Sequence, residues 1–98
     1  MTERELAVRA LLRVRGEITG DGYDVSNFPS TLNRCLEAEI AHVPGWPRKI
    51  VLLYHGAYHV CRDELTPNGL DLWAWSELQD VGSLDERIAQ AIWRLAEG

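Results

Sequence analysis

The stretch KIVLLYHGAYHVCRDEL, residues 49–65, decides the fold, because two largely apolar runs flank the dipeptide Gly56-Ala57. A glycine at the first position of a two-residue loop suits a type II′ turn, one of the turns that close tight hairpins. The runs 49–55 and 58–65 would then be paired antiparallel strands. The stretch therefore predicts a β-hairpin.

The register of this hairpin decides where its two histidines lie. His55 would face Tyr58, and Lys49 would fall opposite Glu64, an opposite-charge pair that favours this register. Side chains alternate between the two faces of a strand. His55 and His59 would therefore point to opposite faces, where they could not bind one metal ion together.

A metal site or a cysteine nucleophile is the other interpretation of the same stretch. Cys61 would share a face with His59, and only Cys35 or His42 could add a further ligand, whereas zinc takes three or four convergent ligands. A Cys61–His59 pair lacks the electropositive, partly exposed setting that lowers the pKa of a thiol. We therefore predict no metal and no cofactor.

Three amphipathic helices surround the predicted sheet. The first starts at a capping box of Thr2 and Glu5, the second spans residues 29–43, and the last starts at a capping box of Ser83 and Glu86. Cys35 falls in the apolar stripe of the second helix, which predicts a buried core thiol.

A third strand is predicted at LDLWAW, residues 70–75, after a turn at residues 66–69. The alternation in this segment is imperfect, and a helical period also fits Leu70, Trp73, Ala74, Leu78 and Val81. The predicted fold class is α+β: two N-terminal helices, a three-stranded antiparallel meander and a C-terminal helix, in a single domain of residues 1–98.

Composition is typical of a soluble globular chain. Apolar residues make up 46% of the 98 residues and charged residues 26%. No apolar run approaches the roughly 20 residues that span a bilayer, and the N-terminus lacks the apolar core of a secretory signal. We expect a cytoplasmic protein with no membrane contact, in which Cys35 and Cys61 are free thiols.

The formal charge of −5 lies entirely in the second half of the chain. Residues 1–49 hold seven acids and seven bases, whereas residues 50–98 hold eight acids and three bases. In the first helix, Arg4, Arg9 and Arg13 indicate a solvated face or a small basic docking patch. An acidic surface repels nucleic acid and attracts basic proteins, although it can also serve solubility alone.

No catalytic motif is present. The sequence has no phosphate-binding loop, no dinucleotide glycine motif and no serine elbow. The acid pairs Asp63-Glu64 and Asp85-Glu86 are adjacent in sequence, so their side chains would point apart and could not flank a substrate. We predict that the protein is not an enzyme.

The predicted sheet would gather an aromatic platform on one face, with carboxylates around it. It would serve either as core beneath the last helix, completed by Trp93, or as a contact surface of the kind that dominates interface energies. The predicted partner-binding residues are Tyr58, Arg62, Asp63, Glu64, Asp71, Trp73, Trp75, Glu77 and Asp80.

In size, acidity and lack of a catalytic motif, the chain resembles small phage-encoded inhibitors such as anti-CRISPR proteins, and also toxin immunity proteins. The resemblance is one of type and rests on no motif. It implies an acidic, non-enzymatic inhibitor, monomeric or homodimeric, that acts as a nucleic-acid mimic. Its partner would be a larger basic protein or nucleoprotein complex whose nucleic-acid-binding surface it blocks.

A winged-helix DNA-binding regulator is the alternative from another class. The order helix, short segment, helix and hairpin fits it, and Ser30, Thr31, Asn33 and Arg34 would open the recognition helix. Glu37 and Glu39 lie in the same helix, where they would repel phosphates. Electrostatics therefore count against direct binding of nucleic acid.

Overall fold

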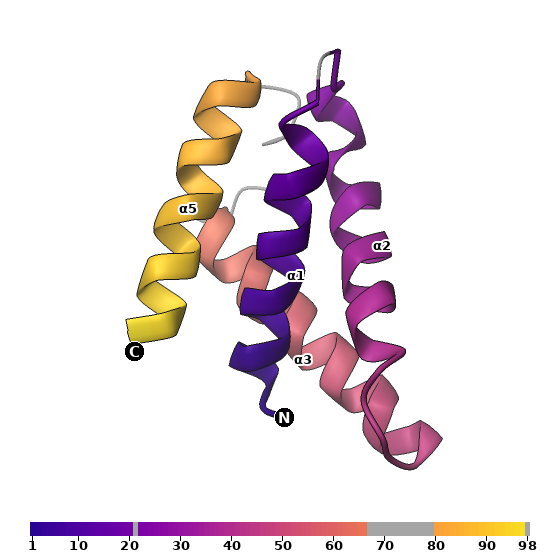
Figure 1. Cartoon of the computed structure of the whole chain (residues 1–98). Coiled ribbons are helices and arrows are strands. Elements are labelled where there is room, and N and C mark those ends of the chain that lie inside the picture. Colours follow the sequence, from indigo (N-terminus) through magenta and orange to yellow (C-terminus); the bar gives the residue numbers. More distant parts are fainter. Residues whose placement is uncertain (21, 67–79, 98) are drawn as a thin grey trace.

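A computed structural model describes residues 1–20, 22–66 and 80–97 of the chain. These residues form α-helices and one short 3₁₀-helix, and no strand occurs among them (Figure 1). The elements are α1 (Glu3–Ile18), η1 (Val25–Asn27), α2 (Phe28–Ile40), α3 (Pro47–Leu65) and α5 (Val81–Glu97). The α+β fold with its three-stranded meander is therefore wrong, because the described architecture is all-helical.

The predicted hairpin at residues 49–65 is one continuous helix, α3. Pro47 lies in its first turn, where proline is favoured. Gly56 costs about 1 kcal/mol in a helix interior, and it is not among the described glycines with positive φ, which are Gly22 and Gly45. The buried and partly buried residues on the inner face of α3 recur at helical spacing. They are Ile50, Leu53, Tyr54, Ala57, Tyr58, Cys61 and Leu65.

The three helices expected on either side of the hairpin are confirmed. Thr2 caps α1, and its hydroxyl oxygen accepts a hydrogen bond from the backbone N–H of Glu5 at 3.1 Å. Helix α5 begins earlier than predicted: the carboxylate of Asp80 accepts from the N–H of Ser83 at 2.7 Å. Asp80 therefore takes the capping role predicted for Ser83. The third strand predicted at 70–75 lies outside the described residues.

Helix α1 lies between α2 and α5, and α3 crosses behind it (Figure 1). One hydrophobic cluster joins the four α-helices of the described part. Its α1 members are Leu6, Ala7, Ala10, Leu11, Val14 and Ile18. The other buried members are Phe28, Leu32, Cys35, Leu36, Ala57, Cys61, Leu65, Leu84, Ile88, Ala91 and Leu95.

Arginine–carboxylate pairs connect neighbouring helices at the rim of this core. Arg15 of α1 donates to both carboxylate oxygens of Asp85 in α5, at 2.9 and 3.2 Å. The remaining interhelical pairs are Arg13–Glu39 and Arg34–Glu17, between α1 and α2, and Arg94–Glu64, between α5 and α3. None of the described helices is both long and apolar enough to cross a lipid bilayer.

The adjacent leucines of α1 provide a matched test of the packing. Leu11 is fully buried, whereas Leu12, on another side of α1, is 52% exposed. We expect Leu11→Ala to lower the free energy of unfolding by about 2–5 kcal/mol, and Leu12→Ala to change it by less than about 0.5 kcal/mol. Urea denaturation followed by circular dichroism measures both values, and equal losses would contradict this placement of α1.

The Arg15–Asp85 pair predicts a specific dependence of stability on pH. Hydrogen bonds from Arg15 lower the pKa of Asp85 below its ordinary value. A carboxylate whose pKa is lower in the folded state stabilises the protein above its unfolded pKa, about 3.9, and loses that contribution as pH falls through the folded value. We expect Asp85→Asn to reduce stability at neutral pH by about 0.2–1 kcal/mol, the usual size of such a surface pair.

The difference between Asp85→Asn and the wild type should shrink as the pH falls below about 4. Urea denaturation at neutral and at acid pH measures it. Glu86→Gln, an exposed acid on the same helix without an ion pair in the described part, is the matched control. A difference for Asp85→Asn that stays constant down to strongly acid pH would show that the pair is not the cause.

Candidate protein-binding surface

The aromatic platform was predicted from the pairing of strands. Residues 49–65 form the helix α3 instead, so this pairing cannot bring the aromatic side chains together. Tyr58 packs partly buried against the core, and Glu64 accepts a hydrogen bond from Arg94 at 2.8 Å. Arg62 and Asp63 are exposed on α3. Trp93 is 65% exposed on α5 and is not part of the core cluster.

The rest of the predicted set is divided between a capping residue and segments that are not described. Asp80 caps α5, and backbone hydrogen bonding from Ser83 lowers its pKa. Asp71, Trp73, Trp75 and Glu77 lie outside the described residues. Their role in partner binding therefore stays a prediction.

A groove opens where the chain passes from α2 into α3. We call it the α2–α3 groove; it has a volume of about 340 Å³. Its walls are the N-terminal residues, the connection between the helices and the first two turns of α3. It is lined by Met1, Thr2, Glu3, Val43, Pro44, Lys49, Ile50, Leu52 and Leu53. Most of these side chains are apolar, so the groove suits an apolar occupant.

Large apolar side chains are exposed in and beside this groove. Leu52 is 63% exposed and Met1 49%, and both line it. Trp46, the residue just before α3, is 81% exposed, and Val51, beside Leu52, is 52% exposed. The described residues hold two further exposed hydrophobic side chains of this size, Leu12 and Trp93, on other helices. Exposed apolar surface therefore concentrates at the start of α3.

The same end of α3 carries positive charge. Arg48 and Lys49 are exposed and make no ion pair within the described residues. The first turn of α3 contains no acid, and the preceding Trp46 offers no side-chain cap to its N–H groups. Backbone N–H groups at a helix start favour negative groups. Arg48, Lys49 and the N–H groups at the start of α3 together make this apolar surface attractive to carboxylates.

Gly45 shapes the connection that forms one wall of the groove. Its φ is +156°, a conformation that side chains rarely adopt. A Cβ atom there would lie 3.4 Å from Cδ1 of Ile50, which lines the groove. The positive φ, and not a lack of space, therefore favours glycine at this point of the connection.

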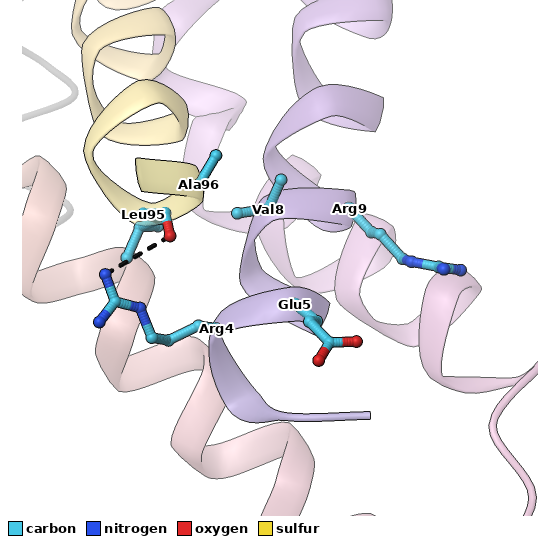
Figure 2. A pocket seen from close by; sticks show the side chains of 6 residues that line it. All are labelled: Arg4, Glu5, Val8, Arg9, Leu95 and Ala96. Carbon is cyan, nitrogen blue, oxygen red and sulfur yellow. Dashed lines mark hydrogen bonds between the residues drawn. The ribbon is translucent and has the colours of Figure 1, made fainter. Parts of the chain in front are cut away.

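A second groove, of about 400 Å³, lies between the start of α1 and the end of α5 (Figure 2). Arg4 donates to the carbonyl oxygen of Leu95 at 3.4 Å, whereas Arg9 points away from α5. Glu5 lines the groove between them. Arg4, Arg9 and Arg13 therefore do not gather into the small basic docking patch that was the alternative to a solvated face, since Arg13 pairs with Glu39.

Both cysteines are free thiols, as predicted, and both are buried, as predicted for Cys35. Burial raises the pKa of Cys35 to about 11, and the charge of Glu17 acts in the same direction. Burial also raises the pKa of Cys61 to about 12. Thiolates are the reactive form of cysteine, so neither residue is placed or charged to act as a nucleophile.

The placement of the histidines corrects the sequence prediction. His55 and His59 are four residues apart in one helix and both are exposed, so they share a face of α3. Cys61 is buried on the other side of that helix, and His42 is exposed beyond the end of α2. Sequence reasoning missed this shared face because it treated the stretch as a hairpin.

Three of the four residues predicted for a winged-helix reader make contacts within the fold, while Ser30 is exposed. Thr31 is buried against the Tyr23 hydroxyl at 2.7 Å, Asn33 accepts from Tyr54, and Arg34 pairs with Glu17. The stretch that would form the wing is α3. This arrangement offers no support to the winged-helix alternative.

Comparison of the chain with known protein families, with curated proteins and with solved structures finds no match.

Thiol titration tests the burial of the cysteines. At pH 8 we expect both thiols of the native protein to react with a disulfide reagent far more slowly than exposed cysteine, whose pKa is about 8.5. Both should react at once in denaturant, giving two thiols per chain. Rapid reaction of one thiol in the native protein would contradict the placement of Cys35 or Cys61.

Proposed function

We propose that the protein acts by binding another protein through the α2–α3 groove and the exposed side chains beside it. The observation that carries the proposal is the exposure of Trp46, Val51 and Leu52 in one short segment. Exposed large apolar side chains that gather in one segment of a small domain are a feature of contact sites. Tryptophan is enriched among the residues that dominate binding energies.

The partner we propose is an amphipathic protein segment with an apolar stripe and flanking carboxylates. The stripe would fill the groove against Leu52 and Ile50. Its carboxylates would face Arg48 and Lys49, which are unpaired within the described residues. Opposite charges at the rim of an interface guide association and set orientation, while apolar contacts supply affinity.

The prediction of an inhibitor that covers a basic nucleic-acid-binding surface concerns another part of the chain. It rests on Asp63, Glu64, Asp71, Glu77 and Asp80, of which Asp71 and Glu77 lie outside the described residues. That prediction, with toxin immunity protein as its alternative, remains a proposal beside this one. So do the non-enzymatic character and the monomeric or homodimeric state.

The proposed location is the cytoplasm. The two buried free thiols are compatible with a reducing compartment. Their raised pKa values also support a binding role over nucleophilic catalysis.

Peptide selection tests the proposed partner chemistry. A displayed library of helical peptides would be selected on the wild-type protein, and Kd values of enriched peptides measured by fluorescence polarisation. We expect peptides with apolar residues at helical spacing and flanking Asp or Glu. Leu52→Asp should weaken them more than tenfold, since it places a charge in the apolar contact, and Lys49→Glu should weaken them most at low salt.

Leu12→Asp is the matched control, because Leu12 is also an exposed leucine but lies on α1. Both aspartate variants should keep the wild-type melting temperature. Equal loss of binding in both variants, or enrichment of lysine-rich peptides, would overturn the proposal. Self-association that Leu52→Asp abolishes would assign the groove to a second copy of the chain instead.

A further inference from the structure

We propose that His55 and His59 form a two-nitrogen chelating site for a divalent transition-metal ion on the exposed face of α3. The site lies outside the α2–α3 groove, and it stands independently of the proposed protein-binding function. It arises from the helical form of residues 47–65, which brings together two imidazoles that a hairpin would have separated.

The spacing of the two histidines suits chelation. Residues four apart in an α-helix lie one above the other, with Cβ atoms about 5–6 Å apart. The same spacing supplies two of the zinc ligands in helical metal sites of the H-x-x-x-H type. Both side chains are exposed on α3, so an ion can reach them from solvent.

No protein group in the described residues competes for the imidazole nitrogens. Each ring makes an edge contact with the preceding tyrosine, Tyr54–His55 at 5.9 Å and Tyr58–His59 at 6.0 Å between ring centroids. Neither imidazole makes a hydrogen bond or an ion pair within the described part. The ring nitrogens are therefore available for coordination.

The ligand chemistry selects the class of ion. Imidazole nitrogen suits Zn²⁺, Ni²⁺ and Cu²⁺, whereas Mg²⁺ and Ca²⁺ prefer oxygen ligands. Asp63 lies one further turn along α3, with its carboxylate 3.9 Å from Arg62. The described residues contain no group of three or more histidine, cysteine or acidic side chains that could hold a metal. The site is therefore an open one, in which water or another molecule completes the coordination.

Metal binding would stabilise the fold as well as occupy the site. Two ligands one turn apart are held in register only when α3 is helical. An ion that binds the native helix more tightly than the unfolded chain raises the melting temperature by mass action. Because the other histidine, His42, lies outside α3, its contribution can be separated by substitution.

The experiment uses the full chain without a histidine tag and nickel chloride as the probe. Isothermal titration calorimetry measures affinity and stoichiometry, and thermal melting measures stabilisation. We expect one Ni²⁺ per chain and a rise of several degrees in Tm. His55→Asn and His59→Asn should each lose at least tenfold in affinity and most of the rise in Tm, while the control His42→Asn should behave as wild type.

The variants replace exposed side chains, and circular dichroism without metal checks that each is folded. The visible spectrum of the Cu²⁺ complex gives a second readout, because it reports nitrogen ligation directly and should change in both α3 variants. The proposal is overturned if wild type binds no nickel, or if His42→Asn loses binding as the α3 variants do. Nickel binding that survives His55→Asn and His59→Asn would also overturn it.

Discussion

Helix α1 has to pack against three neighbours at once, and the arrangement of the described helices depends on that constraint. Its buried residues form one apolar stripe that covers less than half of its circumference, and Arg9 and Leu12 lie on the exposed side opposite. A helix that meets three neighbours along one stripe needs small residues there to let them approach. Ala7 and Ala10 meet that need in α1.

Small residues also occur on α3 where it crosses α1. Ala57 and Cys61 are buried on α3, and the Cys61 thiol lies 4.0 Å from the carbonyl oxygen of Ala7. At Gly56 there is no side chain at all, and the carboxylate of Glu3 occupies the space that a Cβ atom would need. The glycine that suggested a turn in the sequence therefore serves close packing between helices.

The two possible roles of Gly56, in a turn or in helix packing, explain how far the sequence could predict the fold. Thr2 with Glu5, and the apolar stripe around Leu32 and Cys35, carry local signals that tertiary structure does not override, so α1 and α2 were predicted from them. Helix α5 was predicted from Ser83 and Glu86, although Asp80 caps it. Residues 49–65 carry two conflicting signals. A Gly-Ala dipeptide between apolar runs fits a turn, while the spacing of apolar residues fits a helix, and only packing against α1 decides between them.

The candidate surface was missed for a related reason. Trp46 and Leu52 look like core residues in a sequence, because apolar side chains are normally buried. Their exposure follows from the placement of α3 in the fold, which no local pattern reveals. Once α3 is a helix, its inner face is filled by Ala57, Cys61 and Leu65, and the leucine at position 52 faces outward.

Formal charge was also an incomplete guide to the surface, because the acids of the second half are not all free to meet a partner. Glu64 and Asp85 pair with arginines of neighbouring helices, and Asp80 caps α5. These carboxylates are engaged within the fold, so part of the acidic charge of the second half is not free to meet a partner. On α3, by contrast, Arg48 and Lys49 are left without an ion pair in the described part. A chain with a net charge of −5 thus carries two cations without an ion pair in the described part beside exposed apolar side chains, so net charge alone does not describe the local surface.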